Sequence, residues 1–373
     1  MTIPRIIINI PNVIASFVNG KDINTKYEIQ FDVKIQRTIY RLKAGNIKRL
    51  KLHSEVISFP KSDEVQIEIK SIGLNFADVF AILGLYSATP KGSFIPGLEF
   101  SGVVLDQGEN CERFKKGDKV MGVTRFGAYS SHINIDSRYI IKIPDQWSYE
   151  EGASYLVQVL TAYYGLKELG AIKHYQTVLI HSAAGGVGIW ANRIAKKFNC
   201  YTIGTVGSEE KVPLLNLEGY DKGIVRNINS FESDLLRALD GRELHQIMEC
   251  IGGKIMKVGF RHLSPTGRLL LYGSAHYSER KDRPNYLSLI PKYLKRPRID
   301  AQSMIAENKS IMAFNLIYLF QNVELMHQLL VELEQLNLGK PKIGMSFKFE
   351  NLPQAIRHFQ SGKTIGKVVV NLS

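Results

Sequence analysis

The sequence has few cysteines, and they form no metal-binding or disulfide pattern. Its 373 residues include three, Cys111, Cys200 and Cys250, which lie far apart and make no C-x-x-C pair. This spacing argues against a disulfide framework and against a four-cysteine zinc lobe. Among the nine histidines, His132 and His181 show no spaced partner for a catalytic dyad, so both are interpreted as structural.

Long apolar runs and a recognisable leader are also absent. No stretch of about eighteen apolar residues occurs, so no membrane span is expected. The opening run of isoleucines at residues 6–8 is interrupted by Asn9 and Pro11, with neither a basic start nor a small-residue cleavage site. The default expectation is a cytoplasmic enzyme.

Positive charge is abundant but mostly dispersed. The net charge is +13, and a positive charge of this size is compatible with acidic ligands, anionic lipid or nucleic acid as partners. Only residues 280–298 form a basic cluster, and this stretch also holds Leu287 and Ile290. An amphipathic surface and a solvated loop both explain it, and charge runs favour the loop. No nucleic-acid partner is expected.

Hydrophobic periodicity changes near residue 155. Before it, residues 64–70 and 131–135 alternate polar and apolar side chains, as half-buried strands do. After it, helices alternate with short apolar strands, which predicts a nucleotide-binding sheet. The six strands are expected at residues 178–180, 201–205, 222–225, 247–250, 269–272 and 298–301. A helix over 322–336 and a strand at 367–370 are expected to return to the first domain.

This organisation predicts four segments. Residues 1–26 match no pattern and are an unassigned extension, and residues 27–155 form a β-rich domain. Residues 156–312 form the nucleotide-binding domain, and residues 313–373 return to the β-rich domain.

A glycine-rich turn at residues 183–188 lies between an apolar strand and an amphipathic helix. The strand, the helix and the following strand make a unit of about thirty residues, the length of a βαβ motif. Glycines let backbone approach a pyrophosphate, and the helix N-terminus offers free N–H groups. A structural turn without ligand is the alternative. The residues predicted to hold a dinucleotide here are Ala184, Gly185, Gly186, Val187 and Gly188.

Ordered motifs lie at residues 73–78, 84–86, 96–99, 117–120, 160–163, 183–188 and 366–369. Together they resemble those of the zinc-free branch of the medium-chain dehydrogenase/reductase superfamily, the quinone oxidoreductases. Within this branch, residues 38–372 are most similar to the vesicle amine transport protein group, followed by polyketide enoyl reductases. The resemblance implies an α/β fold: a Rossmann doubly wound parallel sheet plus a GroES-like β-rich catalytic domain.

The zinc ligands of the metal-dependent relatives are missing. Those relatives place cysteine where this chain has Asn75, histidine where it has Leu98, and a third ligand near Val157. Amide and aliphatic side chains cannot replace thiolate and imidazole, so no metal is expected. Without a Lewis acid the substrate must be easier to reduce than a simple ketone. Quinones and α,β-unsaturated carbonyl compounds meet this condition, because the developing charge spreads onto a remote oxygen.

The resemblance implies NADPH as the cofactor. Val206 stands where NAD-preferring enzymes place an acidic residue on the ribose 2′-hydroxyl. The loop that follows resembles the family's phosphate-reading loop, in which Gly207, Ser208 and Lys211 would hold the 2′-phosphate.

Other site residues follow from the resemblance. Asn75 would lie beside the nicotinamide, although it can equally cap a helix over residues 76–83. Tyr86 would point its hydroxyl into the substrate cleft, or else only pack; Thr161 would contact the carboxamide, or else bond backbone within its helix. The remaining expected cofactor contacts are Asn227 and Ile251 near the adenine, Gly273, Ser274, Phe314 and Leu316 near the nicotinamide, and Lys367 across the cleft.

Three functions remain open at this point. The first is an NADPH-dependent reductase of quinones or conjugated carbonyls. The second is a stand-alone enoyl-thioester reductase, in which residues 280–298 would meet an acidic acyl carrier protein. The third is a non-catalytic NADPH-binding scaffold. The resemblance also implies a homodimer in which the sixth strand pairs across a two-fold axis.

Overall fold

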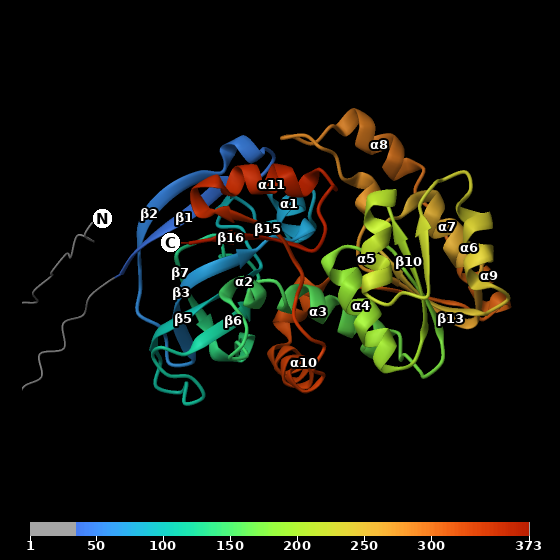
Figure 1. Ribbon diagram of the computed structural model, residues 1–373. Helices are drawn as coiled ribbons and strands as arrows, with labels where there is room; N and C mark the ends of the chain where they lie inside the picture. The colour runs from blue at the N-terminus through green and yellow to red at the C-terminus, as the bar shows by residue number, and fades with distance from the viewer. Residues whose placement is uncertain (1–34, 373) are drawn as a thin grey trace, which may run out of the picture.

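The computed structural model describes residues 35–372, so the expected extension at residues 1–26 lies outside the described part. Two lobes stand side by side, one built on antiparallel strands and the other on a parallel sheet (Figure 1). Helices α3 (Leu156–Tyr163) and α10 (Val323–Gln335) lie between them. This mixed α/β architecture confirms the expected combination of a GroES-like lobe with a Rossmann lobe.

The first lobe contains a seven-stranded sheet in the order β15-β16-β3-β5-β6-β8, with β7 also paired to β3. The long strand β3 is central because it pairs with β5, β7 and β16. The bounds are β3 (Glu64–Gly73), β5 (Glu99–Gln107), β6 (Lys119–Val123), β7 (His132–Asp136), β8 (Ile140–Lys142), β15 (Ile343–Lys348) and β16 (Lys367–Asn371). Strands β15 and β16 come from the C-terminal part, so the tail returns to this lobe.

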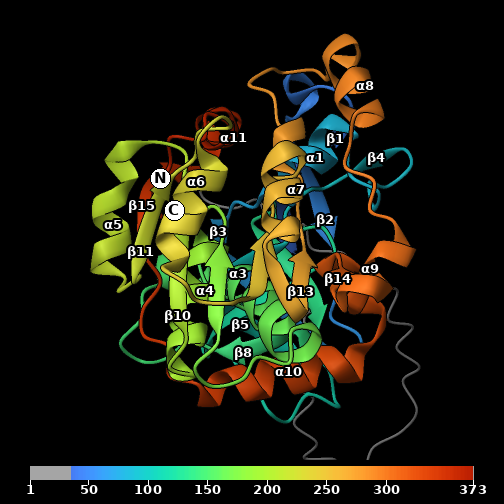
Figure 2. The same ribbon diagram turned by 90° about the vertical axis from the view of Figure 1, so that its right-hand side faces the viewer.

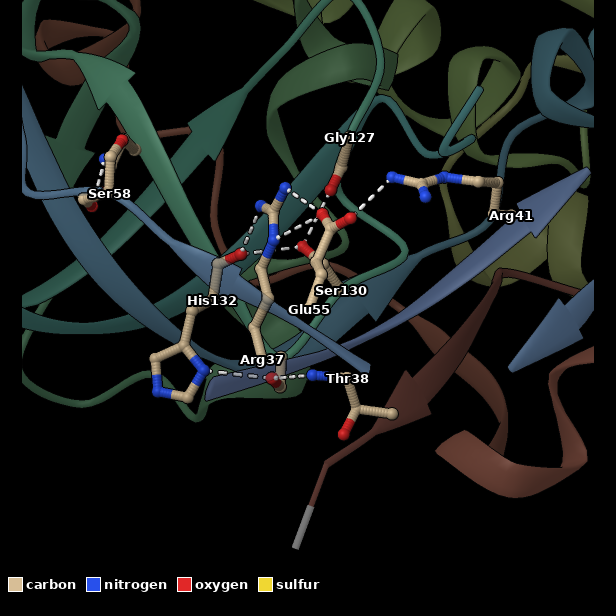
Figure 3. A network of polar contacts seen from close by, with 10 residues as sticks. Arg37, Thr38, Arg41, Glu55, Ser58, Gly127, Ser130 and His132 are labelled. Atoms are coloured by element: carbon tan, nitrogen blue, oxygen red, sulfur yellow. Dashed lines mark hydrogen bonds and ion pairs between the residues drawn. The ribbon is translucent and has the colours of Figure 1, made fainter. Parts of the chain in front are cut away.

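A smaller sheet of β1 (Ile35–Lys43), β2 (Lys51–Ile57) and β4 (Ser93–Phe94) covers one side of this lobe. Its polar contacts are drawn in Figure 3, where two arginines of β1 meet a carboxylate of β2. The Arg37 Nη2 lies 2.7 Å from Glu55 Oε1, and Arg41 Nη2 lies 2.6 Å from Glu55 Oε2. Arg37 also donates to the His132 carbonyl at 3.0 Å, which ties this sheet to β7.

Short helices complete the first lobe. They are η1 (Ile47–Arg49), α1 (Phe76–Leu83), η2 (Ser137–Tyr139), α2 (Tyr149–Gly152), η7 (Phe349–Asn351) and α11 (Leu352–Gln360). The first residue of α1 matches the expected helix start, and its N-cap is Asn75.

The second lobe is a six-stranded parallel sheet in the order β11-β10-β9-β12-β13-β14, the order of a doubly wound dinucleotide-binding fold. Its strands are β9 (Thr177–Ile180), β10 (Tyr201–Val206), β11 (Lys222–Val225), β12 (Leu244–Glu249), β13 (Leu263–Leu271) and β14 (Ser310–Ala313). Its helices include η3 (Tyr164–Leu169), α4 (Gly186–Lys197), η4 (Glu209–Lys211), α5 (Val212–Leu217), α6 (Phe231–Leu239), α7 (Gly253–Arg261) and η6 (Leu316–Gln321). All four residues of β9 are buried because helices cover both faces of the sheet.

The expected sixth strand at residues 298–301 is wrong. The sixth strand is β14, at residues 310–313, where it pairs with β13 in parallel register. Asp300 instead caps α9 (Ala301–Glu307), since its carboxylate accepts from the backbone N–H groups of Gln302 and Ser303. A side-chain acceptor at this point favours a helix start over a strand. The homodimer stays a prediction, and pairing at the sheet edge would use β14.

The basic stretch at residues 280–298 is more than a solvated loop. It contains α8 (Tyr286–Leu294), which follows η5 (Ala275–Tyr277) and stands at the upper edge of the molecule in Figure 2. Leu289 is its buried anchor, whereas Leu287 is 88% exposed. The Asp282 carbonyl accepts from Ile47 N at 3.0 Å, so the stretch is hydrogen-bonded to the first lobe. None of the helices between residues 35 and 372 is long and apolar enough to cross a membrane.

One hydrophobic cluster passes from the first lobe through α3 to the second. It includes Leu98 and Ile141 on one side and Ile180 and Trp190 on the other. Aromatic rings fill the junction, where Tyr155 packs edge-on against Trp190 with 5.0 Å between centroids. Shared apolar burial therefore fixes how the lobes meet.

Replacing Leu179 by alanine is expected to lower the free energy of unfolding of the parallel-sheet lobe by about 2–5 kcal/mol, because a cavity opens in a central strand. Leu179 is 0% exposed. The matched variant Leu287→Ala is expected to stay within about 0.5 kcal/mol of the parent. Urea unfolding followed by circular dichroism measures both; equal midpoints for the two variants would contradict this assignment of the core.

Candidate active site

The glycine turn leads directly into helix α4. Gly185 is the N-cap and provides no side-chain acceptor, so the first N–H groups of α4 have no capping partner. A Cβ on Gly188 would lie 2.6 Å from the Ser182 carbonyl oxygen, so only glycine fits there. The exposed donors and the close backbone approach suit the pyrophosphate of a dinucleotide.

Gln158, on α3, lies against the same turn. A Cβ built on Gly186 would come within 1.9 Å of the Gln158 Oε1. The amide therefore lines the turn from the side of the interlobe helix. Sequence patterns could not identify Gln158, because an isolated glutamine within an apolar helix has no distinctive spacing.

The turn also meets the returning C-terminal segment. The backbone N–H of Gly366 donates to the Ala184 carbonyl at 3.3 Å. Gly366 directly precedes Lys367, the first residue of β16. The turn thus lies next to the polar centre of the first lobe.

That centre is a buried network of Asn75, Glu99 and Lys367. Lys367 Nζ donates to Asn75 Oδ1 at 2.9 Å and also contacts Glu99 Oε1. Asn75 Nδ2 donates to the same Glu99 oxygen at 2.9 Å. Lys367 and Glu99 are each 1% exposed, so the cation and the carboxylate compensate each other away from water.

Asp78 and Tyr129 lie beside this network. Asp78 Oδ2 accepts from the Asn75 backbone N–H at 2.8 Å. Burial raises the pKa of Asp78 to about 7, although the Asn75 N–H and the Lys367 ammonium act in the opposite direction. Burial likewise lowers the pKa of Lys367, against the pull of Glu99, and raises that of Tyr129 well above its ordinary value.

The positions that correspond to zinc ligands in the metal-dependent relatives have no suitable side chains. Leu98 and Val157 belong to the shared hydrophobic cluster. The Val157 backbone N–H donates to Glu99 Oε2 at 3.0 Å, while Asn75 is held by Lys367 and Glu99. No group of three or more His, Cys, Asp or Glu side chains within residues 35–372 is arranged to hold a metal ion. This donor set does not fit a catalytic zinc.

Tyr86 connects the two lobes. Its hydroxyl donates to Asn315 Oδ1 at 2.5 Å. Burial raises the pKa of Tyr86 above its ordinary value, so the phenol keeps its proton at neutral pH. Asn315 belongs to the segment of residues 314–316 expected near the nicotinamide, but nothing in the sequence indicated its hydrogen bond with Tyr86.

The other residues expected near the nicotinamide have these surroundings. Thr161 Oγ1 donates to the Val157 carbonyl at 2.7 Å. This is the hydrogen bond to helix backbone that was the alternative to a contact with the carboxamide. The Phe314 ring packs edge-on against Tyr164, with 5.2 Å between centroids. Gly273 lies close to Cys250, and Ser274 is the N-cap of η5.

The residues expected at the adenosine end lie in two places. Gly207 and Ser208 follow β10, and Lys211 ends η4. The Lys211 ammonium donates to the carbonyls of Gly362 at 2.6 Å and Thr364 at 3.1 Å, so it bridges to the first lobe. Asn227 follows β11 and its side chain accepts from Asn229 N at 3.0 Å, while the Ile251 N–H donates to Glu249 Oε1 at 2.5 Å.

A second buried polar pair supports the strand ends beneath the turn. His181 Nε2 lies 3.2 Å from Glu249 Oε2, and His181 Nδ1 lies 2.8 Å from Thr205 Oγ1. Burial lowers the pKa of His181 to about 3 and raises that of Glu249 to about 7. The imidazole is therefore neutral and structural, as expected from the sequence.

Comparisons with known proteins agree with this geometry. Residues 61–145 match the alcohol dehydrogenase GroES-like domain, and residues 186–330 match the domain described as zinc-binding dehydrogenase. The rat synaptic vesicle membrane protein VAT-1 homolog is 30% identical over 331 residues, which cover 87% of this chain and 81% of the relative. The match to the zebrafish protein of the same name spans 64% of that protein's length.

Solved structures give the same result. A CurK enoyl reductase superposes with a TM-score of 0.78 at 27% identity, over 90% of this chain and 99% of the other. The Escherichia coli quinone oxidoreductase, solved in complex with NADPH, superposes with a TM-score of 0.76 at 23% identity, over 90% of this chain and all (100%) of the other. The chain belongs to the medium-chain dehydrogenase/reductase family of oxidoreductases, in the branch that contains the VAT-1 homologs, quinone oxidoreductases and polyketide enoyl reductases.

Proposed function

We propose that this protein is a zinc-independent, NADPH-dependent reductase of quinones or α,β-unsaturated carbonyl compounds. The observation that carries the proposal is the contact between Gly366 N and Ala184 O, which brings the glycine turn next to a polar centre without, among the described residues, the side chains that a catalytic zinc requires. The NADPH complex of the Escherichia coli relative supports the choice of cofactor. When bound, NADPH supplies the hydride.

The chain's own residues orient the reactants and exclude water. Lys367 and Glu99 hold the Asn75 amide in one orientation, so Asn75 can position the nicotinamide or the substrate. The Tyr86 hydroxyl has one hydrogen, which Asn315 Oδ1 accepts in this structure; when it turns from Asn315 to the substrate, it can donate to the oxygen on which negative charge develops. Cofactor contacts are proposed for Thr161, Ala184, Gly185, Gly186, Val187, Gly188, Gly207, Ser208, Lys211, Asn227, Ile251, Gly273, Ser274, Phe314, Leu316 and Lys367.

A stand-alone enoyl-thioester reductase is the second candidate. It is favoured by the basic segment around α8, in which Arg280, Lys281 and Lys295 are exposed. A reducing polyketide synthase from Hypomyces subiculosus is 34% identical over 237 residues, 62% of this chain. An acidic acyl carrier protein would be the partner of that surface. The domain boundaries and the homodimer expected from the sequence also stay predictions.

NADPH consumption with a panel of quinones, short enals and enoyl thioesters distinguishes these functions. We expect turnover with quinones or enals, less than one zinc per ten chains, and no loss of activity with a chelator, because the ligand positions hold amide and aliphatic groups. Faster turnover of thioesters would favour the second candidate. Stoichiometric zinc, or no turnover of any compound, would contradict the proposal.

The Tyr86→Phe variant is expected to lower kcat/KM about a hundredfold, because it removes one hydrogen bond to the developing oxyanion. Tyr175→Phe is the matched control, since Tyr175 is 78% exposed. Steady-state kinetics with the best substrate of the panel measures both. An unchanged kcat/KM in Tyr86→Phe would remove Tyr86 from the mechanism.

The Asp78 carboxyl makes stability depend on pH. Its folded pKa of about 7 lies above the ordinary value of 3.8, so between these values the folded chain holds a proton that the unfolded chain has lost. The free energy of unfolding should therefore fall as pH rises from about 4 to 7. Asp78→Asn should weaken this fall.

Urea unfolding between pH 4.5 and 7.5 measures the slope, with the exposed Asp145→Asn as the control. The same slope in both variants would contradict the raised pKa of Asp78. A shallower slope in Asp78→Asn alone would support it.

A further inference from the structure

Arg226 directly follows β11 and lies beside the carboxyl end of β10, the neighbouring strand of the Rossmann sheet. Its backbone N–H donates to the Val206 carbonyl at 2.8 Å. Its guanidinium turns across the end of β10, where Nη1 donates to Thr205 O at 3.1 Å and to Thr205 Oγ1 at 3.0 Å. The other terminal nitrogen, Nη2, lies 3.4 Å from the position that a Cβ would take on Gly207. The cation therefore borders the loop that contains Gly207.

The Arg226 guanidinium has spare donors and, among the described residues, no carboxylate within ion-pair distance. Burial lowers the pKa of Arg226, and Glu249 opposes this effect only from beyond contact. No Asp or Glu carboxylate between residues 35 and 372 forms an ion pair with it. Its Nε and Nη2 have no hydrogen-bond acceptor in that part of the chain, since both of its side-chain bonds start from Nη1. A half-buried cation in this condition favours the binding of an anion.

Lys211 makes the same region more positive. Its ammonium is bonded to the neutral carbonyls of Gly362 and Thr364. Burial and the nearby charge of Arg226 lower the pKa of Lys211, so the two cations repel each other. An anion between them would relieve that repulsion.

The donor geometry selects the kind of anion. A guanidinium presents paired N–H groups that match two oxygens of a phosphate, whereas an ammonium is a point charge. Two bonds to Thr205 fix the fork of Arg226 in one orientation. The loop beside it is the one that follows Val206, where an NAD-preferring enzyme would carry an acidic residue.

We propose that Arg226 recognises the 2′-phosphate of NADPH through its free Nε and Nη2 donors and is the main determinant of cofactor preference. Lys211, which the sequence had assigned to this phosphate, contributes less, because its ammonium already links the two lobes. This inference rests on the proposed function, since it deepens the choice of cofactor.

The test is a comparison of dissociation constants by calorimetry for NADPH, NADH, 2′,5′-ADP and 5′-AMP. Arg226→Gln is expected to weaken NADPH and 2′,5′-ADP by about ten- to a hundredfold, the loss typical of a charge-assisted hydrogen bond. NADH and 5′-AMP, which lack the 2′-phosphate, should change by less than about threefold. Arg226→Lys should lie between the parent and Arg226→Gln, and Lys211→Ala should lose less than Arg226→Gln.

Arg237→Gln is the matched control. Arg237 lies on α6, its side chain is 77% exposed, and its one ion pair within residues 35–372 is with Asp234. This variant should bind all four ligands as the parent does. The preference of the parent for NADPH should fall as salt rises, and that of Arg226→Gln should change little.

The outcomes separate this inference from the proposed function. Equal binding of NADPH and NADH by the parent chain would overturn the proposed cofactor itself. A parent that prefers NADPH together with an Arg226→Gln variant that keeps the preference would overturn only the role of Arg226. Equal weakening of all four ligands in Arg226→Gln would show that Arg226 only supports the strand end. A greater loss of NADPH affinity in Lys211→Ala than in Arg226→Gln would identify Lys211 as the main phosphate ligand. If Arg226→Gln fails to fold, the ratios of the dissociation constants of NADPH to NADH and of 2′,5′-ADP to 5′-AMP are compared between Arg226→Lys and the parent.

Discussion

The burial of one ammonium group constrains much of this molecule. Lys367 has almost no contact with water, and a buried cation is tolerated only with a close counter-charge and further hydrogen bonds. Glu99 and Asn75 provide both, which requires the starts of β5, α1 and β16 to converge. Gly366, the residue before Lys367, then donates its backbone N–H to the Ala184 carbonyl in the glycine turn. A structural requirement of the first lobe thereby places the polar centre beside the glycine turn at which we propose that the cofactor binds.

The C-terminal segment connects the lobes at a second point. Gly362 and Thr364 receive the Lys211 ammonium, a few residues before Lys367 enters its network. The loop before β16 therefore touches both the adenosine side and the nicotinamide side of the proposed cofactor site. Tyr86, bonded to Asn315, adds a link from the first lobe. In the proposed function, these contacts would couple cofactor binding to the relative placement of the lobes.

Local sequence patterns predicted much of the fold, whereas features that depend on contacts between distant residues could not be predicted. The α1 start, strand β11 and the glycine turn follow from capping residues, apolar runs and glycine spacing, which act over a few residues. The sixth strand was expected at the wrong place, because the residues around Asp300 favour a helix start, whereas the strand is β14 with its short apolar run at residues 311–313. Gln158 and Arg226 gain their surroundings only when distant elements meet, so spacing alone could not identify them.

The pairing of Glu99 with Lys367 has a consequence for how the chain matures on the ribosome. The two residues are separated by 268 positions, so Glu99 has no cationic partner from this pair until nearly all of the described chain has been made. At the usual speed of synthesis this interval is roughly ten to fifty seconds. The parallel sheet, whose strands all come from residues 177–313, has no such delay. The Rossmann lobe can form during translation, whereas the centre of the GroES-like lobe is completed only after Lys367 emerges.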